Sequence, residues 1–120
     1  MRGLIWGCIY GGGAVVFGAI LSHALSGKLT EKELGTLDIA AKYLFYVAMP
    51  LLVLHLSQKE WRWPIRLFNM FIISAALFSG SLILLVLTKQ SFFAYFTPLG
   101  GGLLILSWAY LLFLGIKKHQ

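Results

Sequence analysis

The chain has 120 residues, of which 59% are apolar and only 12% are charged, whereas soluble domains average roughly 45–50% apolar and about 25% charged residues. A small soluble domain leaves much of its surface in water, so this composition excludes an ordinary soluble fold and favours a bilayer-embedded protein. The formal net charge of +6 does not indicate nucleic-acid binding, because the basic residues are scattered at the ends of apolar runs, as membrane anchors are.

Four apolar runs are candidates to cross the membrane, since a helix needs about 20 mainly apolar residues to do so. We predict helices over about 3–25, 39–57, 66–88 and 98–116. The second is the weakest, because it is short and contains Pro50. Three crossings would leave an apolar run in water, so the chain is expected to form a single all-α membrane domain, a compact bundle of four transmembrane helices.

Small residues recur along the first predicted helix. Gly3, Gly7 and Gly11 follow one another at four-residue spacing, and Ala14, Gly18 and Ser22 continue at the same spacing. Such a stripe lets two helices approach closely, which is a principal source of helix association in lipid. The sequence leaves open whether the stripe packs within the chain or between chains.

The three predicted loops differ in character. Residues 30–33, Thr-Glu-Lys-Glu, fit the capping-box pattern and predict a short interfacial helix in the first loop. The second loop, 59–66, mixes tryptophans with cations, as is typical of the headgroup region. The third loop is short and aromatic, and Pro98 then falls in the first turn of the last helix, where its missing N–H is tolerated.

The Lys and Arg residues predict the orientation. With four crossings, one end of the bundle carries both termini and the second loop, with Arg2, Lys59, Arg62, Arg66, Lys117 and Lys118. The other end carries four basic residues, Lys28, Lys32, Lys42 and Lys89. Because cytoplasmic loops are richer in Lys and Arg, we predict that both termini are cytoplasmic.

Two motifs flank the third loop: Phe78-Ser79-Gly80-Ser81-Leu82 and Thr97-Pro98-Leu99-Gly100-Gly101. They resemble, in this order and spacing, the Phe-Ser-Gly-Ser-Leu-Tyr and Thr-Pro-x-Gly-Gly motifs of the YgdD/YwdK-like family of small four-helix membrane proteins, a domain of unknown function. Ile83 stands where the family has a tyrosine. Trp108 matches a Gly-Trp pair in which Ser107 replaces the glycine.

The resemblance extends into the first two helices. Gly18-Ala19 and His23-Ala24-Leu25 are similar to a Gly-Ala-Phe-Gly-Ala-His-Ala-Leu pattern. Tyr43 and Tyr46 fit a pattern that normally continues Tyr-His, but this chain has Val47. The resemblance implies a fold and a location in the bacterial inner (plasma) membrane. It implies no activity, because the family has none established.

His23 is the most interesting single residue for chemistry, because an imidazole titrates near neutral pH and ligates metals. We favour a structural role, a hydrogen bond at the interface with a tyrosine such as Tyr43 or Tyr46. A membrane haem would need two facing axial ligands, but His23 and His55 are expected at opposite ends of the bundle, about 30 Å apart. We therefore expect no cofactor and no metal site.

Catalytic motifs are absent from the sequence, and no base is evident beside Ser79 or Ser81. We expect these hydroxyls to bond backbone carbonyls, and we expect Gly80 and Gly100 or Gly101 to lie at close helix contacts. The candidate functional or packing residues are His23, Tyr43, Tyr46, Ser79, Gly80, Ser81, Thr97, Pro98, Gly100, Gly101 and Trp108.

The function predicted from these features is non-enzymatic. We expect an accessory or interaction subunit of a membrane assembly, in contact with the lipid bilayer and with a membrane-protein partner or further copies of itself. The alternative is a small oligomeric transporter or channel. A proton-coupled carboxylate mechanism is disfavoured, because the four acidic residues all fall in loops or at helix starts.

Overall fold

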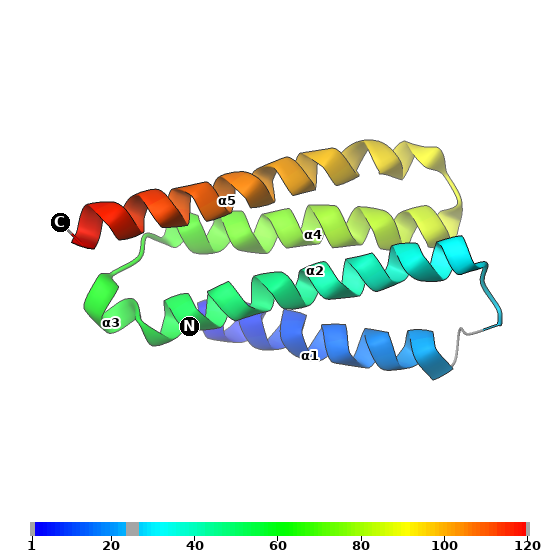
Figure 1. Cartoon of the computed structure of the whole chain (residues 1–120), viewed down its shortest axis with the longest axis horizontal. Helices are drawn as coiled ribbons and strands as arrows, with labels where there is room; N and C mark the ends of the chain where they lie inside the picture. The colour runs from blue at the N-terminus through cyan, green and yellow to red at the C-terminus, as the bar shows by residue number, and fades with distance from the viewer. Residues whose placement is uncertain (1, 24–26, 120) are drawn as a thin grey trace.

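The structure, a computed structural model, describes residues 2–23 and 27–119. Five α-helices and one 3-10 helix follow one another along the chain: α1 (Arg2–His23), α2 (Glu31–Leu56), α3 (Gln58–Trp61), α4 (Ile65–Thr88), η1 (Ser91–Tyr95) and α5 (Phe96–His119). The described residues contain no strand. Four of the helices are long and run side by side, while α3 and η1 are short connecting pieces (Figure 1).

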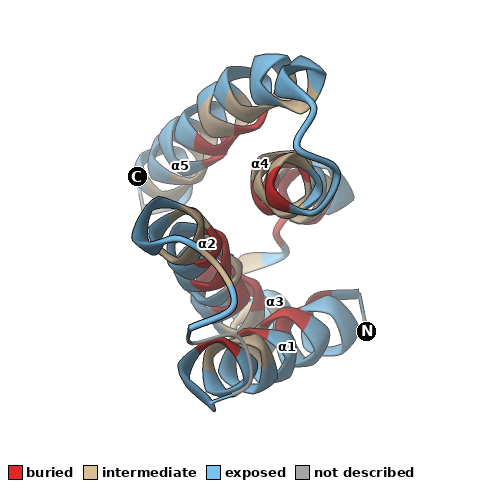
Figure 2. Ribbon diagram, turned by 90° about the vertical axis from the view of Figure 1, so that its right-hand side faces the viewer, coloured by how far each residue is buried: buried red, intermediate tan, exposed pale blue. Residues whose placement is uncertain are grey.

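The long helices pack in chain order. The main contacts join α1 to α2, α2 to α4, and α4 to α5. An end-on view shows α1 and α5 at opposite sides of the molecule, with α2 and α4 between them (Figure 2). We call the end that carries both termini and α3 the terminal end, and the end that carries η1 the distal end (Figure 1).

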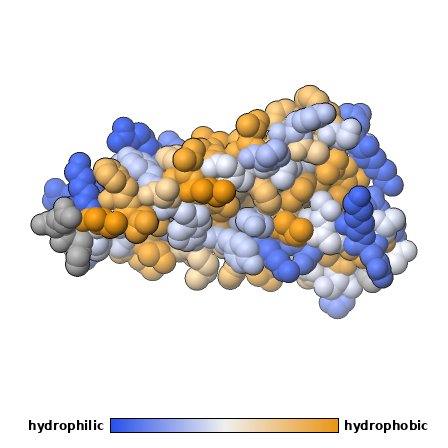
Figure 3. Space-filling view, turned by 45° about the horizontal axis from the view of Figure 1, so that its top comes forward, coloured by the Kyte–Doolittle hydropathy of each residue, from blue (hydrophilic) through white to orange (hydrophobic). Residues whose placement is uncertain are grey.

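Each of the four long segments is long and apolar enough to cross a membrane: α1, α2, α4, and residues 91–118, which comprise η1 and most of α5. Large apolar side chains are exposed along them, including Val15 of α1 and Ile105 of α5. On the face drawn in Figure 3, strongly hydrophilic residues gather toward the two ends, and hydrophobic residues cover much of the length between. The length, composition and surface therefore match the predicted four-crossing bundle.

The core is divided into two clusters along the bundle. The larger one lies mainly between α2 and α4 and includes Val47, Leu51, Leu67 and Phe71, all inaccessible to solvent. The smaller one lies at the distal end and joins Leu21 of α1, Leu37 of α2 and Val86 of α4. The inner helices α2 and α4 therefore provide most of the buried surface, and the outer helices pack against them.

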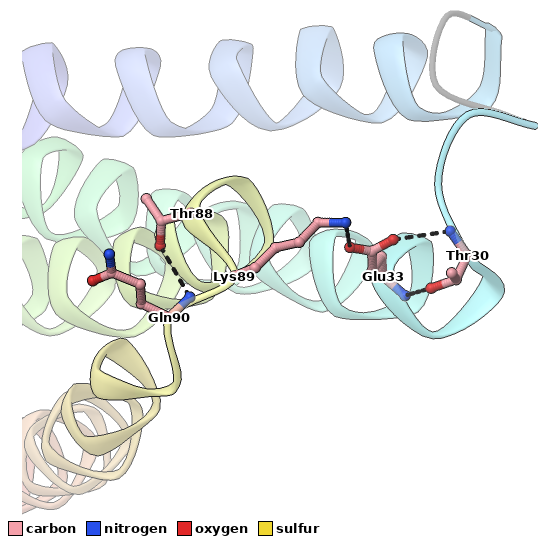
Figure 4. Close-up of polar contacts among 5 residues, drawn as sticks. All are labelled: Thr30, Glu33, Thr88, Lys89 and Gln90. Carbon is pink, nitrogen blue, oxygen red and sulfur yellow. Dashed lines mark hydrogen bonds and ion pairs between the residues drawn. The ribbon is translucent and has the colours of Figure 1, made fainter.

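The capping box predicted at Thr30 is present. The Glu33 backbone N–H donates to Thr30 Oγ1 at 3.1 Å, and the Thr30 N–H donates to Glu33 Oε1 at 3.0 Å. Figure 4 shows that the same carboxylate also faces Lys89 Nζ, at 3.6 Å, from the end of α4. This polar contact connects the distal ends of α2 and α4.

The expectation of a separate interfacial helix in the first loop was wrong. The helix that Thr30 caps continues without a break from Glu31 to Leu56. It passes through Gly35, because a single glycine costs a helix only about 1 kcal/mol, and no proline precedes Pro50. Leu37 in those turns is already buried in the distal cluster. Pro50 is buried inside α2 and does not end the helix. Membrane helices tolerate internal prolines because neighbouring groups satisfy the freed backbone carbonyl.

The other predicted boundaries are close to those observed. The helix predicted over 66–88 spans Ile65–Thr88, and the one predicted over 98–116 spans Phe96–His119, with Pro98 near its start as expected. The helix predicted over 3–25 corresponds to Arg2–His23, and residues 24 and 25 lie outside the described residues. The short α3 was not predicted.

Candidate functional site

The Phe78–Ser81 segment of α4 contacts helices on both sides. Ser79 Oγ donates to the carbonyl oxygen of Ala40 in α2 at 2.8 Å, and both residues are buried. The Ser81 and Thr97 hydroxyls lie 2.6 Å apart and link α4 to α5. Ser81 Oγ also bonds to the carbonyl oxygen of Phe78 at 2.8 Å. The expectation that these hydroxyls bond backbone carbonyls is therefore confirmed.

Gly100 lies where the backbones of α4 and α5 touch. A Cβ atom added to Gly100 would lie 2.8 Å from the Cα atom of Phe78 and even closer to the Phe78 nitrogen. Real Cβ atoms do not approach backbone this closely, so only glycine fits at this crossing. At Gly101 the added atom would make an ordinary contact with the Phe78 ring, at 3.6 Å. The predicted close contact is confirmed at Gly100.

The prediction for Gly80 was wrong. A Cβ added there would meet nothing within 4 Å, because Gly80 falls on the side of α4 that lies away from the Phe78 contact. It lines an apolar recess of about 250 Å³. The other residues around this recess are Ala76, Leu77, Ser81, Leu84, Phe93 and Phe96. The glycine of the Ser-Gly-Ser motif therefore leaves open space beside α4, and no other helix among the described residues comes close to it.

Aromatic rings of α4 contact aromatic rings of both neighbouring helices, α2 and α5. The ring centroids of Phe78 and Tyr43 lie 4.4 Å apart, and those of Tyr43 and Tyr46 lie 5.3 Å apart. Tyr46 is half exposed. Trp108 of α5 meets Phe71 edge to face, at 5.5 Å. Phe71 and Phe78 therefore pack against rings of neighbouring helices. Tyr46 and Trp108, in contrast, each keep about half of their surface exposed.

We call Phe78, Ser79, Ser81, Thr97 and Gly100 the α4 seam. Every hydroxyl of the seam is engaged by another hydroxyl or by a backbone carbonyl. No buried side-chain nitrogen or oxygen among the described residues lacks a hydrogen-bond partner. The seam therefore holds α2, α4 and α5 together, and its two serines form hydrogen bonds that join these helices.

His23 lies exposed at the distal end of α1. The hydrogen bond expected with Tyr43 or Tyr46 is not present in the described residues, so that hypothesis is not confirmed. His55 lies near the terminal end of α2, beside a hollow that Arg2 and Gln58 also line. The two imidazoles are at opposite ends of the bundle, as predicted. Among the residues described, no three His, Cys, Asp or Glu side chains form a group that could hold a metal.

The small-residue stripe of α1 packs partly within the chain. A Cβ at Gly3 would lie 2.8 Å from the carbonyl oxygen of Leu51, and one at Gly7 would lie 2.8 Å from the Leu52 side chain. Toward the distal end the stripe opens, because a Cβ at Gly18 would meet nothing within 4 Å. Gly18 instead borders a hollow between α1 and α2.

One contact between helices was missed from the sequence. The Tyr10 hydroxyl donates to the carbonyl oxygen of Ile72 at 2.7 Å and so joins α1 to α4. A tyrosine in the middle of an apolar helix needs a hydrogen-bond partner for its hydroxyl, and this requirement was the available signal. The sequence does not show which helix provides the partner.

Residues 17–101 match the family described as "Protein of unknown function (DUF423)". The chain is 33% identical over 110 residues to a UPF0382 membrane protein of Staphylococcus epidermidis, covering 87% of this chain and 86% of that protein. It is 31% identical over 115 residues to the UPF0382 membrane protein YwdK of Bacillus subtilis, covering 87% of each.

The match to the UPF0382 inner membrane protein YgdD of Escherichia coli is 29% identical over 121 residues and covers 98% of this chain and 91% of that protein. No solved structure matches the chain. The resemblance carried by the two motifs around the third loop is thus confirmed, and the relatives are named as membrane proteins.

Proposed function

This chain belongs to the DUF423 family, whose members are membrane proteins of unknown function, and on that premise we propose that it is a non-enzymatic accessory or interaction subunit of a membrane assembly. In this proposal the fold is a platform that presents one helix face to a partner inside the bilayer. The partner is another membrane protein or a further copy of the chain.

The outward face of α1 carries the proposal. Cys8, Gly12 and Ala19 are spaced by four and seven residues, so they share one side of the helix, and all three are exposed. A Cβ added at Gly12 would meet nothing within 4 Å. Since α1 lies at one side of the molecule (Figure 2), this face is open to a neighbouring helix. Small residues at such a face permit the close backbone approach that drives association in lipid.

The state of the membrane-embedded hydroxyls supports a non-enzymatic role. Ser74 and Ser107 are buried and donate to the carbonyls of Phe71 and Leu103 in their own helices, each within 3.0 Å. Ser79 is likewise occupied, by Ala40 of α2. The Ser79 bond joins two helices, and the bonds of Ser74 and Ser107 stay within one helix. Among the described residues none of these hydroxyls is hydrogen-bonded to a basic side chain, which would activate a serine nucleophile.

A small oligomeric transporter or channel is the competing function. A coupled transporter usually needs an ionisable group deep in a helix. Glu31, Glu33 and Asp38 lie in the first turns of α2, where Asp38 pairs with Lys42 at 2.9 Å. These three carboxylates lie at the distal end and not deep in the membrane, so they give a coupled transporter little support. The open face of α1 supports an interaction subunit more strongly.

The charge distribution supports a cytoplasmic location for both termini. The terminal end carries six Lys and Arg residues and a single acidic residue, Glu60. The distal end carries four basic residues and three acidic ones. Under the positive-inside rule the terminal end faces the cytoplasm. We propose this orientation in the inner (plasma) membrane.

The test is extraction of the tagged chain from its native membrane in a mild detergent, followed by measurement of the particle mass. The proposal expects a defined oligomer or a larger assembly. Gly12→Leu should reduce it to the monomer, because the side chain would keep a neighbouring helix away. Gly102→Leu is the matched control, since Gly102 on α5 also has open space around it. A strictly monomeric wild-type protein would contradict the proposal.

A further inference from the structure

A polar hollow lies at the terminal end, where two distant parts of the chain meet. It has a volume of about 570 Å³ and is lined by Lys59, Glu60, Trp61, Arg62 and Lys118. The first four residues belong to α3 and the turn that follows it, and Lys118 belongs to the last turn of α5. Figure 1 shows α3 and the C-terminal end of α5 at the same end of the molecule. Three cations thus surround the hollow together with a single carboxylate.

Among the described residues, no cation at this end forms an ion pair with a carboxylate, and Glu60 is the one acidic residue that lines the hollow. Both ion pairs in the described part of the chain involve lysines of the distal half, Lys42 with Asp38 and Lys89 with Glu33. At the terminal end, Arg2 donates to Asn69 Oδ1 at 2.7 Å and Arg66 donates to the Tyr110 hydroxyl at 3.0 Å. These partners are neutral, so the excess positive charge attracts an anion from outside the chain.

The turn that presents the cations is held in one conformation. The Gln58 side-chain amide donates to the carbonyl oxygen of Trp63 at 2.9 Å, and its Oε1 accepts the Trp63 backbone N–H at 2.7 Å. The Trp63 indole N–H donates to Ser57 Oγ at 2.8 Å. Arg62, between these anchors, has a left-handed backbone with φ of 53°. Such a fixed turn lowers the entropy lost when Lys59 and Arg62 bind a ligand together.

The surroundings of the hollow favour a lipid as the source of the anion. Trp61 stacks on the buried Trp63 with nearly parallel rings, whose centroids lie 5.1 Å apart. Indole rings prefer the headgroup region of a bilayer. The hollow lies at the terminal end of the bundle, between the α3 turn and the last turn of α5. Basic pockets between membrane helices bind the phosphate groups of acidic lipids. We propose that this hollow binds the phosphate of an anionic phospholipid headgroup through Lys59, Arg62 and Lys118.

The test measures binding of phosphatidylglycerol and of zwitterionic phosphatidylcholine to the full chain in non-ionic detergent, by native mass spectrometry. The wild type should prefer phosphatidylglycerol. Because each basic residue near an anionic surface contributes about 1 kcal/mol, Lys59→Gln with Lys118→Gln should weaken binding about 10- to 30-fold. The matched control, Lys28→Gln with Lys32→Gln, removes the same charge from exposed lysines of the distal end and should change binding by less than about twofold.

Two outcomes would overturn the proposal. An equal loss of binding in the two double variants would show that only the total charge matters. Inorganic phosphate that binds to the wild type, depends on Lys59 and Lys118, and displaces phosphatidylglycerol completely would identify free phosphate as the ligand. Equal melting temperatures of the wild type and both double variants would show that all three are folded, so that a loss of binding reports on the hollow.

Discussion

Ser79 in α4 donates its hydroxyl to the backbone carbonyl of Ala40 in α2, at 2.8 Å, with both residues buried. This hydrogen bond joins the two inner helices. At the same place α5 packs against α4, since Gly100 of α5 lies against the backbone of Phe78, the residue before Ser79. The family motif around Ser79 therefore serves to position three helices.

The hydrogen bond between the inner helices should contribute measurably to stability. Ser79→Ala removes it and should lower the free energy of unfolding by about 0.5–1.5 kcal/mol, the usual size of a hydrogen bond between membrane helices. Ser74→Ala is the control, because Ser74 is equally buried but bonds only within its own helix. Unfolding in a denaturing detergent should show the larger loss for Ser79→Ala. Equal losses would show that the contact with Ala40 adds nothing.

The crossing of α4 and α5 should tolerate only glycine at position 100. Gly100→Ala places a methyl group against the backbone of Phe78, which cannot rotate aside, so the helices must separate. We expect a loss of about 2 kcal/mol or more. Gly102→Ala, on the same helix but with open space around it, should be neutral or slightly stabilising. Thermal melting in detergent measures both, and a Gly100→Ala protein as stable as the wild type would contradict this packing.

Gly80 should tolerate larger side chains in the isolated protein. Because an added Cβ has open space there, Gly80→Ala should leave stability unchanged or raise it by about 0.5–1 kcal/mol through its better helix propensity. Gly80→Leu should extend into the apolar recess and still fold. A strongly destabilised Gly80→Ala protein would show that α4 is packed closely at this position after all.

The sequence predicted the packing of Gly100 correctly and that of Gly80 incorrectly. The positions of the long helices follow from runs of apolar residues, and the cap at Thr30 follows from local hydrogen-bonding chemistry. The close contact at Gly100 was also predictable, because small residues mark helix crossings in lipid. Nothing in the sequence shows on which side of α4 its neighbours lie, so Gly80 was assigned the same role as Gly100, incorrectly.

The hollow beside α3 was missed for a related reason. Lys118 is separated from Lys59 by two membrane crossings, and their proximity depends on the order in which the helices pack. The two hydrogen bonds between the Gln58 side chain and the Trp63 backbone depend on side-chain geometry. The spacing of apolar residues along the sequence does not predict that geometry. The tryptophans and cations of this loop did predict a place in the headgroup region, and the hollow lies among them.

Both termini should be cytoplasmic. A protease-sensitive tag at either terminus should be protected in intact cells and cleaved after the membrane is opened, because the more basic end of the bundle is retained inside. A tag inserted after Gly27, in the first loop, is the control and should be accessible from outside. Cleavage of a terminal tag in intact cells would reverse the proposed orientation, and would place the basic hollow outside the cell.

The central claim, that the outward face of α1 binds a neighbouring membrane helix, is tested most directly by photo-crosslinking in native membranes. A photoreactive amino acid replaces Ile9, which is 53% exposed beside Gly12 on α1, or Ile105, which is 70% exposed on α5. We predict discrete adducts of defined mass from position 9, lost when Gly12→Leu is added, and none from position 105. The absence of a discrete adduct at position 9, or the same adducts from both positions, would contradict the claim.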